Sequence, residues 1–162
     1  MIVIADTGPL NYLVLIGEVD VLQPLYIRVI VPEAVVKELR AAGAPTSVRA
    51  WIARPPAWLE TQPDPPPDST LAFLDPGESA ALTLAQLLNA DELLIDDRAG
   101  RAEAARRRLR VTGTLGVLAD AHLAGLADFD PAITRLHSTN FRLDPDLERI
   151  VRLSISMGRK KP

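Results

Sequence analysis

Acidic side chains follow two short apolar segments of this 162-residue chain. Asp6 comes directly after the apolar run 1–5, and the pair Asp96 and Asp97 comes directly after the apolar run 93–95. Carboxylate oxygens are the ligands that hard divalent cations such as Mg²⁺ prefer. Carboxyl groups brought together without a cation must instead share or take up protons. The chemistry to look for is therefore metal binding or acid–base catalysis by paired carboxyl groups.

Two glutamates are further candidates, and both are expected on helices. Glu38 lies in the segment 32–42, on the flank of its apolar stripe, and Glu78 lies in the first turn of the segment 75–88. If these side chains join the aspartates, two charges about 4 Å apart repel by about 4 kcal/mol at an effective dielectric near 20. A divalent cation would relieve that repulsion, lower the pKa of a bound water and stabilise a phosphoryl oxygen, as in phosphodiester hydrolysis.

Each carboxylate also has a purely structural interpretation. Asp6 could close a turn before Gly-Pro, and Asp97 could cap the helix that follows it. Glu78 stands three residues after Asp75, the spacing of a capping box. Glu38 could be a solvated helical residue paired with a neighbouring basic side chain. Only convergence of these residues would favour a functional site over these alternatives.

The triplet Asp6-Thr7-Gly8 also matches the catalytic loop of aspartic proteases. Such an enzyme needs two of these loops sharing a proton, and the sequence contains one, so a homodimer would be required. Helical patterns dominate the chain, whereas a protease of the retroviral type needs a β-rich chain. We rank this hypothesis behind the others.

Short apolar segments alternate with helical patterns along the chain. This alternation predicts an α/β domain with a parallel sheet, whose strand ends would position the aspartates at one edge. Gly43 is expected to stop a helix that starts at Pro32, and residues 6–9 are expected to form a turn. The expected strands are 1–5, 26–31, 58–62, 91–95 and 110–113, and the expected helices are 10–17, 19–26, 32–42, 47–53, 75–88, 98–109, 115–126, 131–137 and 144–156.

Composition narrows the class of protein. With 48% hydrophobic residues, the chain 1–162 predicts one domain, with a proline-rich loop around 55–69 and a flexible basic tail at 158–162. It contains no cysteine, which excludes disulfides and thiolate zinc sites. We expect no membrane association and a cytoplasmic location, because no secretory leader and no run of about 20 apolar residues is present. The net charge of −3 argues against a wholly basic nucleic-acid-binding surface but allows a local one.

Several motifs together resemble the PIN-domain nucleases, and most closely the branch of PIN-like proteins related to VapC-type toxins, a branch described as predicted nucleic-acid binding. The matching stretches run in the family's order from Ile2 to Ala121. They are IADTGPLNYL, IVPEAVVKEL, LDPGESAALTLA, LLIDDRAGRAEA and VTGTLGVLADA. The resemblance implies a three-layer α/β/α sandwich with a central, mainly parallel sheet of four to five strands. It also implies Mg²⁺ or Mn²⁺ and endoribonuclease activity on RNA, and in many relatives a toxin restrained by an antitoxin protein. We expect a homodimer.

The resemblance also assigns residues. Asp6, Glu38, Glu78 and Asp97 match the four catalytic acidic positions of the family, with Asp6, Glu78 and Asp97 as metal ligands. Asp96 is a further metal-ligand candidate beside Asp97, where typical relatives carry a small residue. Thr7 matches a Ser/Thr position whose hydroxyl supports the site.

Arginines and an alternative function complete the expectations. Arg98 and Arg101 lie nearest the carboxylates in the arginine-rich segment 98–110, and we predict that they contact RNA phosphates. The alternative to a ribonuclease is a catalytically silent nucleic-acid-binding or regulatory domain of the same fold, which acts through dimerisation or a protein partner. Coordinates distinguish the two, since failure of the carboxylates to converge would favour the silent domain.

Overall fold

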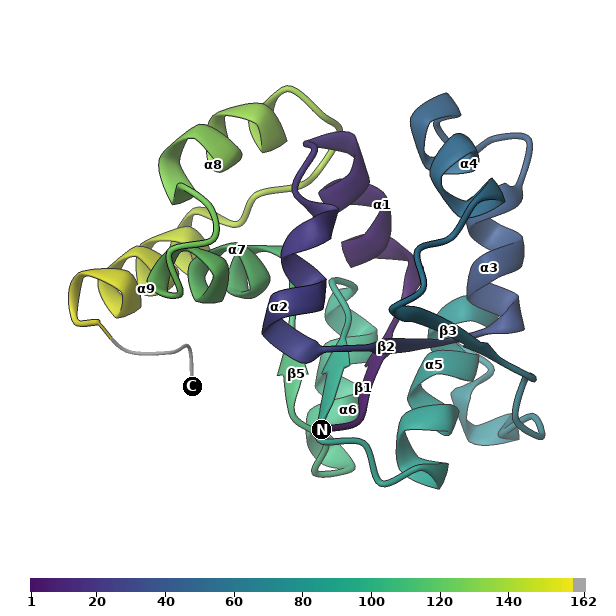
Figure 1. The fold of residues 1–162 in the computed structure, drawn as a ribbon. Coiled ribbons are helices and arrows are strands. Elements are labelled where there is room, and N and C mark those ends of the chain that lie inside the picture. The colour runs from purple at the N-terminus through teal and green to yellow at the C-terminus, as the bar shows by residue number, and fades with distance from the viewer. Residues whose placement is uncertain (159–162) are drawn as a thin grey trace.

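A computed structural model describes residues 1–158. Within them, five parallel strands form one sheet in the order β3-β2-β1-β4-β5 (Figure 1). The predicted α/β fold with a mainly parallel sheet of four to five strands is therefore confirmed. The strands are β1 (Val3–Ala5), β2 (Val29–Pro32), β3 (Leu59–Gln62), β4 (Glu92–Leu94) and β5 (Val111–Thr112).

Helices lie on both faces of this sheet (Figure 1). Helix α5 packs on β1, β2 and β4, and α6 packs beside it, whereas α2 and α7 pack together over the other face. The helices are α1 (Thr7–Leu15), α2 (Leu22–Tyr26), α3 (Glu33–Arg40), α4 (Thr46–Ala53), α5 (Pro76–Leu87), α6 (Arg98–Arg106), α7 (Thr114–Leu123), α8 (Phe129–His137) and α9 (Pro145–Ser156), with 3-10 turns at Val19–Val21 and Ser69–Leu71.

The central strands are buried along their whole length, which explains their unbroken apolar sequences. Ile4 pairs with Ile30 of β2 and with Leu93 of β4. The Asp6 backbone N–H donates to Leu94 O at 2.8 Å, so the ladder between β1 and β4 continues one residue past β1. This pairing places the carboxyl ends of β1 and β4, and the aspartates that follow them, at the same edge of the sheet.

Several predicted boundaries differ from the structure, and two of them have a clear physical reason. Helix α1 begins at Thr7, because Pro9 falls within the first turn, where its missing N–H costs no hydrogen bond. Pro32 is extended, with ψ of 158°, and pairs with Gln62 as the last residue of β2. Helix α3 therefore begins at Glu33, one residue later than expected, and it ends at Arg40 before Gly43.

The proline-rich region is interrupted by the edge strand β3 and then anchored by one arginine. Arg107 of the loop after α6 donates to Asp68 Oδ2 and Gln86 Oε1 at 2.8 Å each, and to Thr70 Oγ1 at 2.9 Å. Its side chain is only 12% exposed, and its bond to Asp68 is partly buried. These bonds fix the segment that leads into α5. The predicted basic tail lies, apart from Gly158, outside the described residues.

Among residues 1–158, no helix is long and apolar enough to cross a membrane.

Candidate metal centre

Asp6 lies at the centre of the site. It is the N-terminal capping residue of α1, yet its side chain makes no capping hydrogen bond. The residue is only 4% exposed, and its Oδ1 atom has no hydrogen-bond partner among the described residues. Burial raises the pKa of this carboxyl well above its usual value, and the charges of Asp75, Glu78 and Glu38 raise it further. A turn-closing aspartate would not carry such an uncompensated buried oxygen.

Glu38 reaches the same place from α3. Its Oε2 atom accepts a hydrogen bond from the Thr7 hydroxyl, and its Oε1 atom accepts one from the Gly77 backbone N–H at 3.1 Å. The side chain is half-buried, and burial is the main cause that raises its pKa. Glu38 is thus held between the starts of α1 and α5, rather than paired with a basic neighbour in solvent. Thr7 lies where a supporting hydroxyl was predicted.

Asp75 is the third member of the cluster, and the sequence indicated only its capping role. Carboxylate oxygens of Asp6, Glu38 and Asp75 all lie within 4.8 Å of one another. Asp75 Oδ1 accepts from the Glu78 backbone N–H at 2.8 Å, as the capping-box spacing predicted. An N-cap uses one carboxylate oxygen and leaves the other for a second partner, and this signal could have identified the residue.

Glu78 and Asp97 are not part of the group formed by Asp6, Glu38 and Asp75. Glu78 Oε2 accepts from the Asp75 backbone N–H at 3.2 Å, which closes the capping box. Burial, followed by the charge of Asp75 and then that of Asp97, raises the pKa of Glu78 to about 7. Asp97 Oδ2 caps α6 by accepting from the Gly100 N–H at 2.8 Å. The structural interpretations of Glu78 and Asp97 therefore describe their contacts correctly. In addition, the charge of Glu78 raises the pKa of Asp6, and the charge of Asp97 raises the pKa of Glu78.

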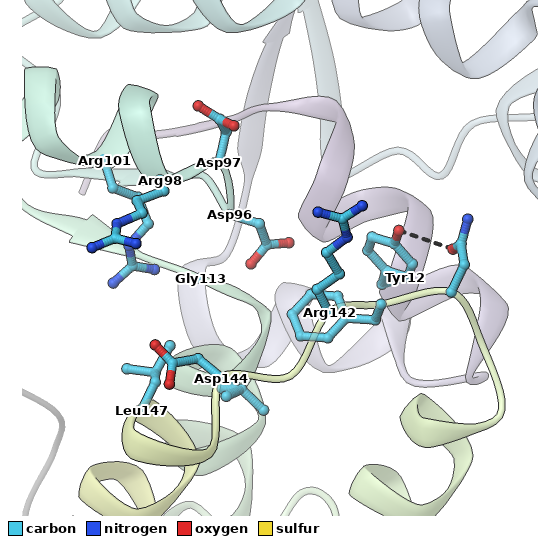
Figure 2. Close-up of a pocket in the computed structure, with 12 residues that line it drawn as sticks. Tyr12, Asp96, Asp97, Arg98, Arg101, Gly113, Arg142, Asp144 and Leu147 are labelled. Carbon is cyan, nitrogen blue, oxygen red and sulfur yellow. Dashed lines mark hydrogen bonds between the residues drawn. The ribbon is translucent and has the colours of Figure 1, made fainter.

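Asp96 differs from Asp97 in both direction and partners. Its Oδ1 accepts from the Thr114 backbone N–H and its Oδ2 from the Thr114 hydroxyl, each at 2.7 Å. It is confined by two glycines, since a Cβ on Gly8 would lie 3.2 Å from Oδ2 and one on Gly113 would lie 2.8 Å from Oδ1. Figure 2 shows Asp96 turned into a cavity and Asp97 turned away from it. The role of Thr114 was not expected from the sequence.

The predicted RNA-contacting residues, Arg98 and Arg101, line the cavity of Figure 2 together with Asp96 and Asp97. Arg98 is exposed at the start of α6, and the Arg101 guanidinium donates to Ile95 O at 3.4 Å. These arginines are near the aspartates, as predicted, but they face the side of the β4–α6 loop that Asp96 occupies.

The arrangement fits a hard divalent cation. Its donors are carboxylate oxygens, the kind that Mg²⁺ and Mn²⁺ bind, and one of them belongs to Asp6, whose buried Oδ1 has no hydrogen-bond partner among the described residues. Without a cation, carboxylates this close favour the uptake of protons, and burial raises the pKa values of Asp6 and Glu38. Asp6 and Asp75 precede the first residues of α1 and α5, and Glu38 lies within α3, so their convergence depends on the packing of these three helices.

Comparison with protein families agrees with this geometry. Residues 2–155 match a family described as a PIN domain. The chain belongs to the PIN-domain family. PIN domains are usually nucleases, they typically use divalent metals, and an acidic cluster with the buried Asp6 is present in this one. No curated protein and no solved structure matches the chain. The recognition of a PIN domain from the sequence is thus confirmed, and its parallel sheet is not the β-rich frame of an aspartic protease.

Proposed function

We propose that this PIN domain is a divalent-metal-dependent endoribonuclease that hydrolyses RNA phosphodiester bonds. The observation that carries the proposal is the trio Asp6, Glu38 and Asp75, which offer carboxylate oxygens within 4.8 Å of one another. Asp6 is buried, and its Oδ1 has no hydrogen-bond partner among the described residues. Carboxylates this close repel one another, and such a cluster is expected where it binds an ion.

Each residue has a definite task in this proposal. Asp6, Glu38 and Asp75 would hold Mg²⁺ or Mn²⁺, which supplies charge stabilisation at the phosphoryl oxygens and a lowered pKa for the attacking water. Thr7 keeps Glu38 turned toward Asp6 through its hydrogen bond. Glu78, with a pKa of about 7, is suited to accept the proton that leaves the attacking water.

The two aspartates after β4 would act at the edge of this centre. Asp97 lies close enough to raise the pKa of Glu78, and it would serve as the fourth acidic group that the family resemblance assigns. Both carboxylate oxygens of Asp96 accept hydrogen bonds from Thr114. We therefore assign Asp96 the role of holding the β4–α6 loop rather than that of a metal ligand.

The test is cleavage of RNA by the purified chain with Mg²⁺ or Mn²⁺, with and without a chelator. Asp6→Asn should lower the rate by about 100-fold or more, because losing a ligand removes several kcal/mol of transition-state stabilisation. Glu33→Gln changes an exposed acidic residue at the start of α3 and serves as the matched control. Cleavage that survives chelation, or normal cleavage by Asp6→Asn, would refute the proposal.

A catalytically silent nucleic-acid-binding or regulatory domain is the second candidate. It is favoured by one observation: Glu78 and Asp97, two of the four expected catalytic acids, both serve helix caps. RNA binding without metal-dependent cleavage would support it. A toxin role with an antitoxin, a homodimer and a cytoplasmic location stay predictions, which co-purification, light scattering and fractionation would test.

A further inference from the structure

A cavity of about 1110 Å³ opens beside the β4–α6 loop, with Asp96 and Asp97 in its lining. Its walls come from α1, the β4–α6 loop, the start of α7 and the segment that joins α8 to α9 (Figure 2). Binding sites for small ligands measure about 300–1000 Å³, so this volume accommodates a group of nucleotide size. Asp97 belongs both to this lining and to the electrostatic surroundings of Glu78.

Three guanidinium groups reach this cavity. Arg98 and Arg101 stand on one side of Asp96 in Figure 2, and Arg142, from the α8–α9 segment, stands on the other. The eight ion pairs found within residues 1–158 engage other arginines, and Arg101 also donates to Ile95 O at 3.4 Å. Arg142 was not predicted from the sequence, because both predicted phosphate contacts, Arg98 and Arg101, lie on α6.

The aspartates of the lining each serve a helix start. Asp96 accepts from the Thr114 N–H at 2.7 Å, Asp97 from the Gly100 N–H at 2.8 Å, and Asp144 from the Asp146 N–H at 2.9 Å. Helix N-termini stabilise negative charge, so part of the charge of each carboxylate is offset within the fold.

The far wall offers aromatic and amide groups. Tyr12 and Phe141 meet edge to face with their ring centroids 4.8 Å apart, and the Tyr12 hydroxyl donates to Asn140 Oδ1 at 3.0 Å. That bond leaves the Asn140 amide nitrogen as a donor toward the cavity rim. Aromatic faces and amides are the groups by which proteins hold unstacked bases of single-stranded RNA.

We propose that this cavity binds a nucleotide of single-stranded RNA adjacent to the phosphate at the metal centre. Arg98, Arg101 and Arg142 contact its phosphates, and the wall formed by Tyr12, Asn140 and Phe141 contacts a base. The inference rests on the proposed function, since one polynucleotide strand supplies phosphates to both the arginines and the carboxylate centre. An acidic peptide would satisfy the arginines but not the aromatic wall.

The test is fluorescence anisotropy of an end-labelled, short single-stranded RNA of mixed sequence, titrated with the full chain in a chelator so that no cleavage occurs. Arg142→Ala should weaken binding about tenfold and reduce the slope of log Kd against log salt by about one. Arg149→Ala is the matched control, because Arg149 is an exposed arginine of α9 paired with Asp146. It should bind as the unmodified chain does, and Asn140→Ala should weaken binding with no change in the salt slope.

Three results would overturn the inference. The first is no RNA binding by the unmodified chain, and the second is an equal effect of Arg142→Ala and Arg149→Ala on RNA binding. The third is that Arg142→Ala loses binding to a glutamate-rich peptide while its RNA binding stays intact. The last would assign the cavity to an acidic peptide. Because the titration needs neither metal nor cleavage, its outcome does not depend on whether the chain is a nuclease. RNA binding here by an unmodified chain that does not cleave RNA with Mg²⁺ or Mn²⁺ would refute the nuclease alone.

Discussion

The Gly77 backbone N–H donates to Glu38 Oε1 at 3.1 Å, and the two residues are so close that a Cβ on Gly77 would overlap the Glu38 carboxylate. Gly77→Ala should therefore displace Glu38 from Asp6 with little harm to the fold, since a flexible side chain can move aside. We expect a loss of RNA cleavage of about tenfold or more, with a melting temperature close to that of the unmodified chain.

Gly43→Ala is the control for this substitution, because a Cβ at Gly43 meets nothing within 4 Å. It should cleave RNA normally. Unimpaired cleavage by Gly77→Ala would show that the position of Glu38 does not matter for the reaction.

Asp75 has two roles that one substitution can separate. Asn caps helices as well as Asp does, so Asp75→Asn should keep the bond to the Glu78 N–H while removing a charge from the cluster. We expect unchanged or slightly higher stability without metal, together with weaker Mn²⁺ binding and slower cleavage. Asp75→Ala removes the cap as well and should cost about 1 kcal/mol of stability. If Asp75→Asn bound Mn²⁺ with normal affinity, Asp75 would be a helix cap only.

The pH dependence of stability follows from the raised pKa values of Asp6, Glu38 and Glu78. The folded state holds these protons more tightly than the unfolded chain, so the stabilisation is complete below the unfolded pKa and is lost as the pH rises through the folded one. For Glu78 this window runs from 4.5 to about 7. In a chelator, the melting temperature should fall across that window, and less steeply for Glu78→Gln.

Asp68 and Glu103 do not obscure this test, because their arginine and threonine partners hold their pKa values at about 2, below the window. Gln keeps the capping box, so Glu78→Gln changes charge without removing the helix cap. Identical pH profiles for Glu78→Gln and the unmodified chain would contradict the raised Glu78 pKa.

Most of the fold was predictable because its central strands are buried on both faces and leave continuous apolar runs at β1, β2 and β4. Strand order depends on contacts between distant segments, and the sequence alone did not specify it. Pro32 illustrates a local limit: its pairing with Gln62 keeps it in β2, although a proline before an acidic residue is typical of a helix start.

The site was predictable where one residue has one dominant role. Asp6 and Glu38 were predicted and lie together, because a strand end and a helix flank fix their directions. Asp75 was interpreted as a cap, since its spacing to Glu78 explains that role fully and hides the second oxygen. Asp96 and Asp97 could not be distinguished, because their directions depend on Thr114, a residue 18 positions further along the chain.

The central claim is that Asp6, Glu38 and Asp75 share a divalent ion. It is tested most directly by calorimetric titration of Mn²⁺ into the full chain above pH 7, where the carboxyl of Glu78, with its pKa of about 7, is also ionised. We predict saturable binding that Asp6→Asn weakens at least about tenfold and Glu33→Gln leaves unchanged. Binding by Asp6→Asn equal to that of the unmodified chain would contradict the claim.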